Sequence, residues 1–313
     1  MSFTSGPAIA NASPMNRNVR ANGLDFHCLE QGHGEPILFL HGFPDHAATW
    51  RPLSERLAPE FRLIAPDLRG YGLTSRPLDV ESYRLGHLID DVAALIDAFD
   101  LSMVHLCGHD WGGVLAFAFA EKHPHKAASL TVLNAPPPAV LQKMIWNDPN
   151  QRLASQYITM LRSAEADALF NETNVDALIE RFLAQPYRHG LLNDADIEAY
   201  RHAWTQKGVW QAMLAWYRAS PFDVPDIDAE FGNDFLDECH IECPVQIIWG
   251  DLDAVFVPAM ADAIVHACPE AILTRLPAAG HVPHRDTPEC CAALITKFIA
   301  QHPIRPISKE VTA

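Results

Sequence analysis

The fold and the chemistry are both indicated by the stretch Met103-Val104-His105-Leu106-Cys107-Gly108-His109-Asp110-Trp111-Gly112-Gly113-Val114. It opens as an apolar run typical of a buried strand and continues as an apolar, helix-like segment. The sharp turn between them presents Asp110 at its tip, with glycines clustered where a helix must pack closely on a strand. This is the pattern of a nucleophile elbow, whose usual form is Gly-x-Ser-x-Gly. An Asp that merely caps the helix is the alternative interpretation.

The residue at the tip of the turn determines the predicted reaction. A serine there would indicate an esterase, lipase or peptidase. This chain has Asp110 instead. A carboxylate nucleophile attacks a carbon that bears a leaving group, and the product is an alkyl ester. The sequence therefore predicts a covalent alkyl-enzyme intermediate on Asp110.

Composition excludes several classes of partner. The 313 residues suffice for one large α/β domain or two of medium size, and the 49% hydrophobic fraction is ordinary for a globular protein. A formal charge of −16 argues against nucleic acid or an anionic membrane as partner. No apolar run approaches the ~20 residues that span a bilayer. Seven scattered cysteines suit a reducing compartment, so we predict a cytoplasmic location.

Strand-like and helix-like patterns alternate through most of the chain. Short apolar runs predict strands at residues 24–31, 36–40, 61–65, 103–107, 129–133, 245–249 and 271–276. Helical periodicity lies between them, at residues 47–57, 85–99, 111–122, 259–267 and 288–300. This alternation predicts an α/β fold with a mostly parallel central sheet flanked by helices.

The alternation stops between residues 139 and 220. These residues are helical in character, rich in Ala, Leu, Gln, Arg and Trp. We therefore divide the chain into an N-terminal arm (1–23), a core (24–138 and 221–313) and an inserted helical cap (139–220). A cap in this place would cover the carboxyl edge of the sheet, where ligands bind in such folds.

Three candidate catalytic side chains each follow a predicted strand. They are Asp110, then Asp253 in Gly-Asp-Leu-Asp, then His281 in Ala-Ala-Gly-His. Because parallel strands end at one edge of a sheet, we expect the three to meet there, in the order nucleophile, acid, histidine of a hydrolase triad. Taken singly, a surface turn explains Asp253 and a loop histidine explains His281.

A fourth motif, His-Gly-Phe-Pro at residues 41–44, also follows a strand. The backbone N–H of Phe43 would lie opposite that of Trp111. Two N–H groups aimed at one oxygen make an oxyanion hole. We also expect the side chains of Phe43 and Trp111 to contact the substrate.

Together these motifs resemble the epoxide hydrolase branch of the α/β-hydrolase superfamily, which is related to haloalkane and fluoroacetate dehalogenases. The resemblance covers residues 24–300 and is weakest in the cap. It implies an α/β-hydrolase fold and an enzyme that hydrolyses epoxides to vicinal diols, with water activated by His281 and Asp253. The matching pieces are His41-Gly42-Phe43-Pro44, Asp67-Leu68-Arg69-Gly70-Tyr71-Gly72, Gly108-His109-Asp110-Trp111-Gly112-Gly113, Leu133-Asn134-Ala135-Pro136, Trp249-Gly250-Asp251-Leu252-Asp253 and Gly280-His281.

The resemblance also implies two cap tyrosines that donate to the epoxide oxygen, because the alkoxide formed on ring opening is a poor leaving group. Tyr157 and Tyr217 fall where those tyrosines are expected, and Tyr217, in Trp-Tyr-Arg, is the better match. A half-buried cap aromatic is the alternative for each.

A haloalkane or haloacetate dehalogenase with the same triad is the main alternative function. Haloalkane dehalogenases usually place an Asn directly after His-Gly, where this chain has Phe43. Fluoroacetate dehalogenases carry arginines just after the nucleophile, where this chain has Trp111 and Val114. Both departures favour an epoxide hydrolase over a dehalogenase. A non-enzymatic small-molecule receptor is a third alternative, but it would not need a complete triad.

The predicted partners are a small apolar epoxide and water, without a cofactor or metal. Cys239-His240-x-x-Cys243 has the spacing of part of a metal site. The chain supplies no matching second pair nearby, and a structural zinc needs about four ligands. The sequence leaves open whether the protein forms a homo-oligomer.

Overall fold

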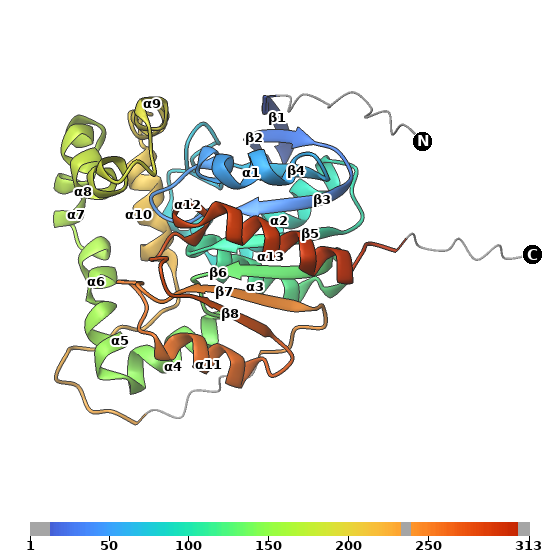
Figure 1. Ribbon diagram of the computed structural model, residues 1–313. Helices are drawn as coiled ribbons and strands as arrows, with labels where there is room; N and C mark the ends of the chain where they lie inside the picture. The colour runs from blue at the N-terminus through green and yellow to red at the C-terminus, as the bar shows by residue number, and fades with distance from the viewer. Residues whose placement is uncertain (1–12, 233–238, 306–313) are drawn as a thin grey trace, which may run out of the picture.

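The computed structural model describes residues 13–232 and 239–305. Figure 1 shows a central sheet with helices on both faces and a further group of helices beyond one side of it. Within the described residues the sheet has eight strands, in the order β1-β2-β4-β3-β5-β6-β7-β8. The strands are β1 (Met15–Ala21), β2 (Leu24–Gly32), β3 (Glu35–Leu40), β4 (Phe61–Pro66), β5 (Val104–His109), β6 (Ala127–Leu133), β7 (Val245–Gly250) and β8 (Ile272–Leu276).

The sheet is mostly parallel, as predicted. Strand β2 pairs antiparallel with β1 and with β4. From β4 through β3, β5, β6 and β7 to β8, every neighbouring pair is parallel. The carboxyl ends of β3, β5, β6, β7 and β8 therefore meet at one edge, which is where the predicted site residues follow their strands.

Strand β1 corrects the predicted N-terminal arm. Residues Met15–Ala21 pair with β2 at the edge of the sheet, with Val19 opposite Phe26. Most side chains of β1 are exposed. An edge strand with polar residues on both faces lacks the apolar alternation that reveals a strand in sequence. The rest of the predicted arm, residues 1–12, lies outside the described residues.

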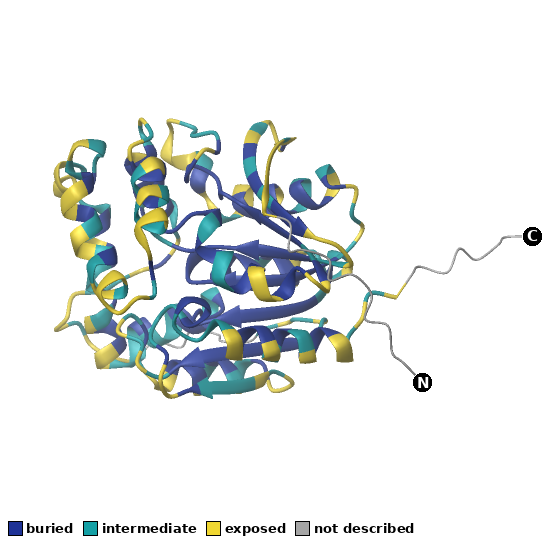
Figure 2. Ribbon diagram, turned by 45° about the horizontal axis from the view of Figure 1, so that its top comes forward, coloured by how far each residue is buried: buried dark blue, intermediate teal, exposed yellow. Residues whose placement is uncertain are grey.

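Two helical layers cover the sheet because its strands are apolar on both faces. In β3, Leu38 packs with helices α2 and α3 on one face, whereas Phe39 packs with α1 and α13 on the other. Figure 2 shows the strands buried and the outer faces of the helices exposed. The core helices are η1 (Ala47–Trp50), α1 (Arg51–Leu57), η2 (Val80–Tyr83), α2 (Leu85–Ala98), α3 (Trp111–Lys122), η3 (Pro124–Lys126), α11 (Ala259–Ala267), α12 (Pro283–Asp286) and α13 (Pro288–Gln301).

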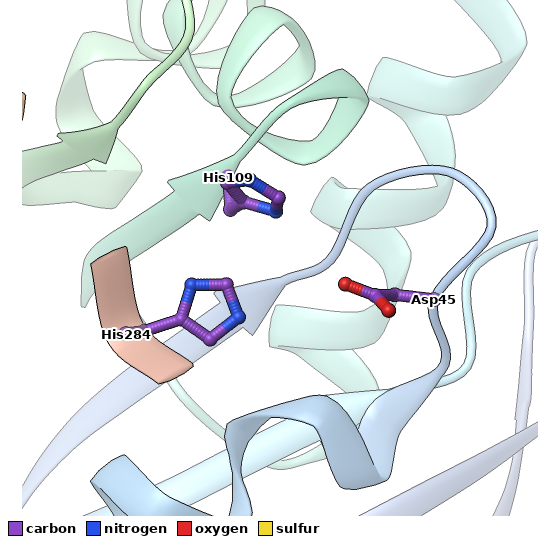
Figure 3. Close-up of side chains that lie close together, drawn as sticks. All are labelled: Asp45, His109 and His284. Carbon is purple, nitrogen blue, oxygen red and sulfur yellow. The ribbon is translucent and has the colours of Figure 1, made fainter. Parts of the chain in front are cut away.

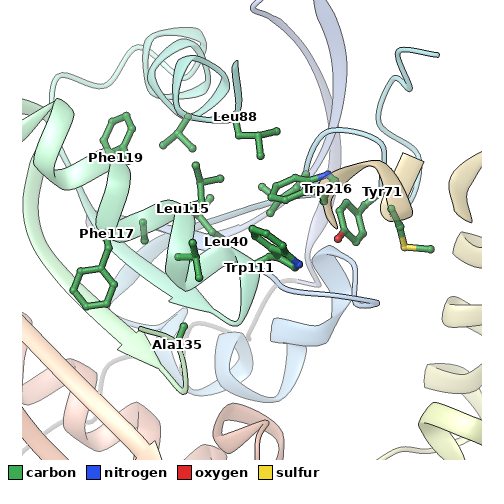
Figure 4. Packing of buried hydrophobic residues seen from close by; sticks show 14 of the residues in the cluster. Leu40, Tyr71, Leu88, Trp111, Leu115, Phe117, Phe119, Ala135 and Trp216 are labelled. Carbon is green, nitrogen blue, oxygen red and sulfur yellow. The ribbon is translucent and has the colours of Figure 1, made fainter. Parts of the chain in front are cut away.

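Helix α3 follows β5 and lies in the middle of the larger hydrophobic cluster. Leu115 and Phe119 on this helix are almost fully buried. Figure 4 shows them close to Leu88 of α2, and shows Trp111 at the start of α3 beside Trp216. The ring centroids of Trp111 and Trp216 are 5.9 Å apart, so helix α3 packs directly on the segment inserted between β6 and β7.

The described chain between β6 and β7 is helical up to Ala219, in agreement with the predicted interruption of the sheet. We call this segment the helical insertion. No helix among the described residues is both long and apolar enough to span a bilayer. The insertion contains α4 (Pro138–Asn147), α5 (Pro149–Ala154), α6 (Gln156–Arg162), α7 (Glu165–Leu169), η4 (Glu172–Asn174), α8 (Val175–Arg188), α9 (Asp194–Trp204) and α10 (Val209–Ala219).

Candidate active site

Asp110 stands at the turn between β5 and α3 with a strained backbone. Its φ is 51° and its ψ is −125°. A positive φ is uncommon for a residue that is not glycine and is retained where the surrounding structure enforces it. The conformation is enforced by close packing, since a Cβ on Gly112 would lie 1.9 Å from the backbone oxygen of Leu40. A Cβ on Gly42 would lie 2.3 Å from the side chain of Asp110.

Replacing Gly112 by alanine should therefore destabilise the protein. The added methyl group would meet the backbone of β3, which cannot rotate away as a side chain can. We expect the free energy of unfolding to fall by about 3 kcal/mol, the upper part of the usual range for overpacking. Urea unfolding measures this change. Gly86→Ala is the matched control, because its Cβ would meet nothing within 4 Å, and an equal loss in both variants would contradict the packing argument.

The structure brings the three predicted triad residues together. Nδ1 of His281 lies 2.9 Å from Oδ2 of Asp253, and Nε2 of His281 lies 3.6 Å from Oδ2 of Asp110. The carboxylate of Asp253 can only accept a hydrogen bond, so Nδ1 carries the proton that it donates to Asp253. The opposite nitrogen of His281 then faces the Asp110 carboxylate.

Asp253 is held as an anion by several donors. The Nδ2 of Asn134 donates to its Oδ2 over 2.6 Å, and the N–H of Val255 donates to its Oδ1 over 2.6 Å. Burial by itself would raise the pKa of Asp253, but the attraction of His281 and the hydrogen bonds from His281, Asn134 and the N–H of Phe256 hold it below its ordinary value. The sequence had marked Asn134 only as part of a matching motif, without a role.

The two oxygens of the Asp110 carboxylate have different surroundings. The N–H of Phe43 donates to Oδ1 over 2.7 Å, as expected of an oxyanion-hole donor, whereas Oδ2 faces His281. Burial favours a raised pKa for Asp110, but the interactions with His281 and the Phe43 N–H outweigh it and lower the pKa. Asp110 is therefore ionised at neutral pH, as a nucleophile requires.

His281 lies between two carboxylates. Burial would lower its pKa, but Asp253 and Asp110 raise it to about 10. The resting site at neutral pH thus holds an imidazolium between two anions. Loss of either negative charge would remove part of this effect and lower the pKa of His281.

A cavity of about 300 Å³ opens beside Asp110. Its walls are mainly apolar, and both predicted tyrosines line it together with Phe43. Trp111 does not contribute to the lining formed by the described residues; its ring packs 5.3 Å from that of Tyr217. The lining residues are Phe43, Pro44, Asp45, His109, Asp110, Tyr157, Met160, Leu161, Phe170, Arg181, Phe182, Leu183, Tyr217, Val255, His281, Val282 and Arg285.

Tyr157 and Tyr217 come from helices α6 and α10 of the insertion and meet at the cavity. Their ring centroids are 6.0 Å apart at an interplanar angle of 78°. Burial raises the pKa of both phenols, and the negative charge of Asp110 adds to the effect. Both hydroxyl groups therefore stay protonated and can donate to an oxygen atom placed in the cavity.

The sequence reasoning missed a cluster of buried polar residues behind the triad. Asp45, His109 and His284 present ligand-type atoms within 4.8 Å of one another, and Figure 3 shows the three side chains around a common space. Asp45 accepts a hydrogen bond from the hydroxyl of Tyr200. Asp45 also already accepts from Arg285 over 3.1 Å. These contacts favour a hydrogen-bonding role over a metal site.

A signal for this cluster was present in the sequence. Asp45 directly follows the His-Gly-Phe-Pro motif, His109 directly precedes Asp110, and His284 and Arg285 follow closely on His281. Charged or polar residues that abut motifs at strand ends share the edge of the sheet with them. Nothing in the spacing alone indicates that they are buried.

Comparison with known proteins agrees with this geometry. Residues 35–288 match the family described as alpha/beta hydrolase fold. A Bacillus subtilis (strain 168) protein, AB hydrolase superfamily protein YfhM, is 30% identical over 289 residues, which are 90% of this chain and 96% of that protein. Human epoxide hydrolase 4 is 30% identical over 292 residues, which are 90% of this chain and 78% of that protein.

The fold is also similar to solved structures. One is a crystal structure of a mutant epoxide hydrolase from Bacillus megaterium, complexed with its product, a naphthyloxy-propane-1,2-diol. It superposes with a TM-score of 0.82 at 30% sequence identity and covers 91% of this chain and 100% of that one. The chain therefore belongs to the α/β-hydrolase family, as an epoxide hydrolase-like hydrolase.

Proposed function

We propose that this protein hydrolyses epoxides to vicinal diols through an alkyl ester on Asp110, and that the helical insertion acts as the cap over the site. The observation that carries the proposal is the cavity in which Tyr157 and Tyr217 line one chamber with Asp110 and His281. The Bacillus megaterium relative, solved with a diol product, supports the same reaction.

In the first step, an Asp110 oxygen attacks a carbon of the epoxide ring. A carbon–oxygen bond forms to Asp110 as the ring carbon–oxygen bond breaks. The epoxide oxygen takes a proton from the tyrosine pair, Tyr157 and Tyr217, which regains it from solvent. The leaving alkoxide is thereby neutralised. Such general acid catalysis by a positioned hydroxyl accelerates ring opening.

In the second step, water cleaves the ester. His281, oriented by Asp253, takes one proton from water as the oxygen of that water attacks the ester carbonyl of Asp110. The N–H of Phe43, which donates to Oδ1 in the resting enzyme, would stabilise the oxyanion, and such a donor is typically worth about 3 kcal/mol. We propose the N–H of Trp111 as the second donor. The leaving oxygen takes the other water proton and the diol departs.

Formation of the ester prepares His281 for this second step. Alkylation removes the negative charge of Asp110, one of the two charges that raise the pKa of His281 to about 10. The pKa of His281 consequently falls, which favours release of its proton to solvent and thus the neutral form that acts as the base. The resting charge arrangement keeps Asp110 ionised, and formation of the ester favours the base form of His281.

Tyr217→Phe tests the assignment to epoxides. We expect the rate of alkylation by styrene oxide to fall by about tenfold or more, because the epoxide oxygen loses one of its two donors. A halide needs no proton, so any release of bromide from a bromoalkane should be unaffected. Stopped-flow alkylation rates and a halide assay measure the two reactions. An equal loss in both would contradict the assigned role.

The proposed reaction itself is tested by following diol formation from styrene oxide beside halide release from bromoalkanes and haloacetates. Diol without halide supports the proposal. Halide without diol would assign the same triad to a dehalogenase. If neither diol nor halide forms, the receptor alternative is favoured. From composition we also infer a cytoplasmic location and no nucleic-acid or membrane partner.

A further inference from the structure

A buried polar cluster connects the helical insertion to the segment that carries His281. Asp45 follows β3, Arg285 lies on α12, and Tyr200 comes from α9 of the insertion. The Tyr200 hydroxyl donates to Oδ1 of Asp45 and accepts from Nη2 of Arg285 over 2.8 Å. The same Nη2 lies 3.1 Å from Oδ1 of Asp45. Each of the three is at most 7% exposed, so bulk solvent has little access to these contacts.

Arg285 connects the cluster to His281 through the chain itself, since it lies four residues after His281 in the turn of α12. His109, beside the cluster, contacts the same segment, because its Nε2 donates to the backbone oxygen of His281 over 2.8 Å. Burial lowers the pKa of His109 to about 4, so its ring is neutral and its Nδ1 is an acceptor. This nitrogen has no partner among the described residues and shares the space around Asp45 (Figure 3).

Tyr200 differs from the other members of the cluster in two respects. Asp45, His109 and Arg285 line the substrate cavity, whereas Tyr200 is not among the described residues that do so. Tyr200 is also not the sole anchor of its helix, because the indole of Trp204 on α9 donates to the oxygen of Pro44 over 2.8 Å. Loss of the Tyr200 hydroxyl should therefore leave α9 docked and the cavity walls in place.

We propose that Tyr200 is a positioning residue for His281, acting through Arg285 and Asp45. This inference rests on the proposed function. His281 acts as a base only when the ester is cleaved, and small displacements of a catalytic group cost large factors in rate. A contact made by the insertion thus sets the geometry of the second step while leaving the first step alone.

Tyr200→Phe tests the proposal. Ester hydrolysis should slow about tenfold while alkylation stays within about twofold. Under saturating styrene oxide, the ratio of alkylated to unalkylated enzyme equals the rate of alkylation divided by the rate of ester hydrolysis. This ratio should therefore rise about tenfold. It is read directly from intact-protein mass spectra. kcat/KM, which reports only the steps up to irreversible alkylation, stays unchanged. A general loss of structure would lower kcat/KM as well.

The matched control is Tyr83→Phe. Tyr83 is also buried, its hydroxyl donates to the oxygen of Pro77 over 2.9 Å, and it does not line the cavity. This variant should keep the wild-type ratio of alkylated to free enzyme. Arg285→Lys keeps the positive charge but loses the planar guanidinium group. It should raise the ratio of alkylated to unalkylated enzyme as Tyr200→Phe does.

The outcomes separate the two proposals. If styrene oxide alkylates the wild-type enzyme but Tyr200→Phe keeps its ratio within about twofold, the positioning role is wrong and the proposed reaction stands. If neither the wild-type enzyme nor His281→Gln is alkylated by any reactive epoxide, the proposed function itself is wrong.

Discussion

Asp110→Asn is expected to abolish epoxide turnover, with kcat falling by about four orders of magnitude or more. The amide is a far weaker nucleophile than the carboxylate, so no ester forms. The fold should survive, because the amide oxygen can still accept from the N–H of Phe43, which lies 2.7 Å from Oδ1 in the native protein. Steady-state diol formation measures the loss, and a thermal unfolding curve confirms that the variant is folded.

Two further observations sharpen the result for Asp110→Asn. Slow self-deamidation would regenerate the native aspartate, so any activity that grows on standing should be accompanied by a mass gain at residue 110. Asp251→Asn is the matched control. Asp251 lies in the same loop as Asp253 but pairs with Arg275 and does not line the cavity, so its loss should leave kcat unchanged. A loss smaller than about tenfold in Asp110→Asn would contradict its role as nucleophile.

His281→Gln is expected to stop the reaction after the first step. Asp110 keeps its carboxylate and the two tyrosines keep their hydroxyls, so the epoxide still alkylates the enzyme. Water then lacks its base, and steady-state turnover should fall about a thousandfold or more. Alkylation is expected to be detectable as one epoxide mass added per chain, while epoxide consumption stops at one molecule per chain and almost no diol is released.

The control for His281→Gln is a histidine of similar chemistry outside the site. His266 on α11 is exposed and does not line the cavity, so His266→Gln should turn over like the native enzyme. If His281→Gln loses activity without accumulating any adduct, the two-step scheme fails even though the residue is essential. That outcome would instead favour a direct attack of water on the epoxide.

The meeting of the three candidate catalytic residues could be predicted because their signals are local. Asp110, Asp253 and His281 each follow an apolar strand, and parallel strands necessarily end at one edge of the sheet. The φ of 51° at Asp110 and the crowding around Gly112 are the structural counterparts of the glycine cluster seen in the sequence. Short-range patterns thus sufficed to predict the core of the site.

The rest could not be predicted because it depends on contacts between distant residues. The bond from Tyr200 to Asp45 joins residues 155 positions apart, and that from Arg285 to Asp45 joins residues 240 positions apart. The periodicity of apolar residues along the sequence does not predict such pairs. Strand β1 was missed for a different reason, since its exposed polar residues, including Asn16 and Asn18, resemble a loose arm.

Asp110 is the residue proposed to carry the substrate as an ester, and peptide sequencing can locate that ester on the chain. His281→Gln is mixed with styrene oxide, quenched in acid and digested, and the peptides are sequenced by tandem mass spectrometry. We expect a mass increase of one styrene oxide, confined to the Asp110 side chain and absent in the double variant that also carries Asp110→Asn. No added mass, or a mass on another residue, would contradict it.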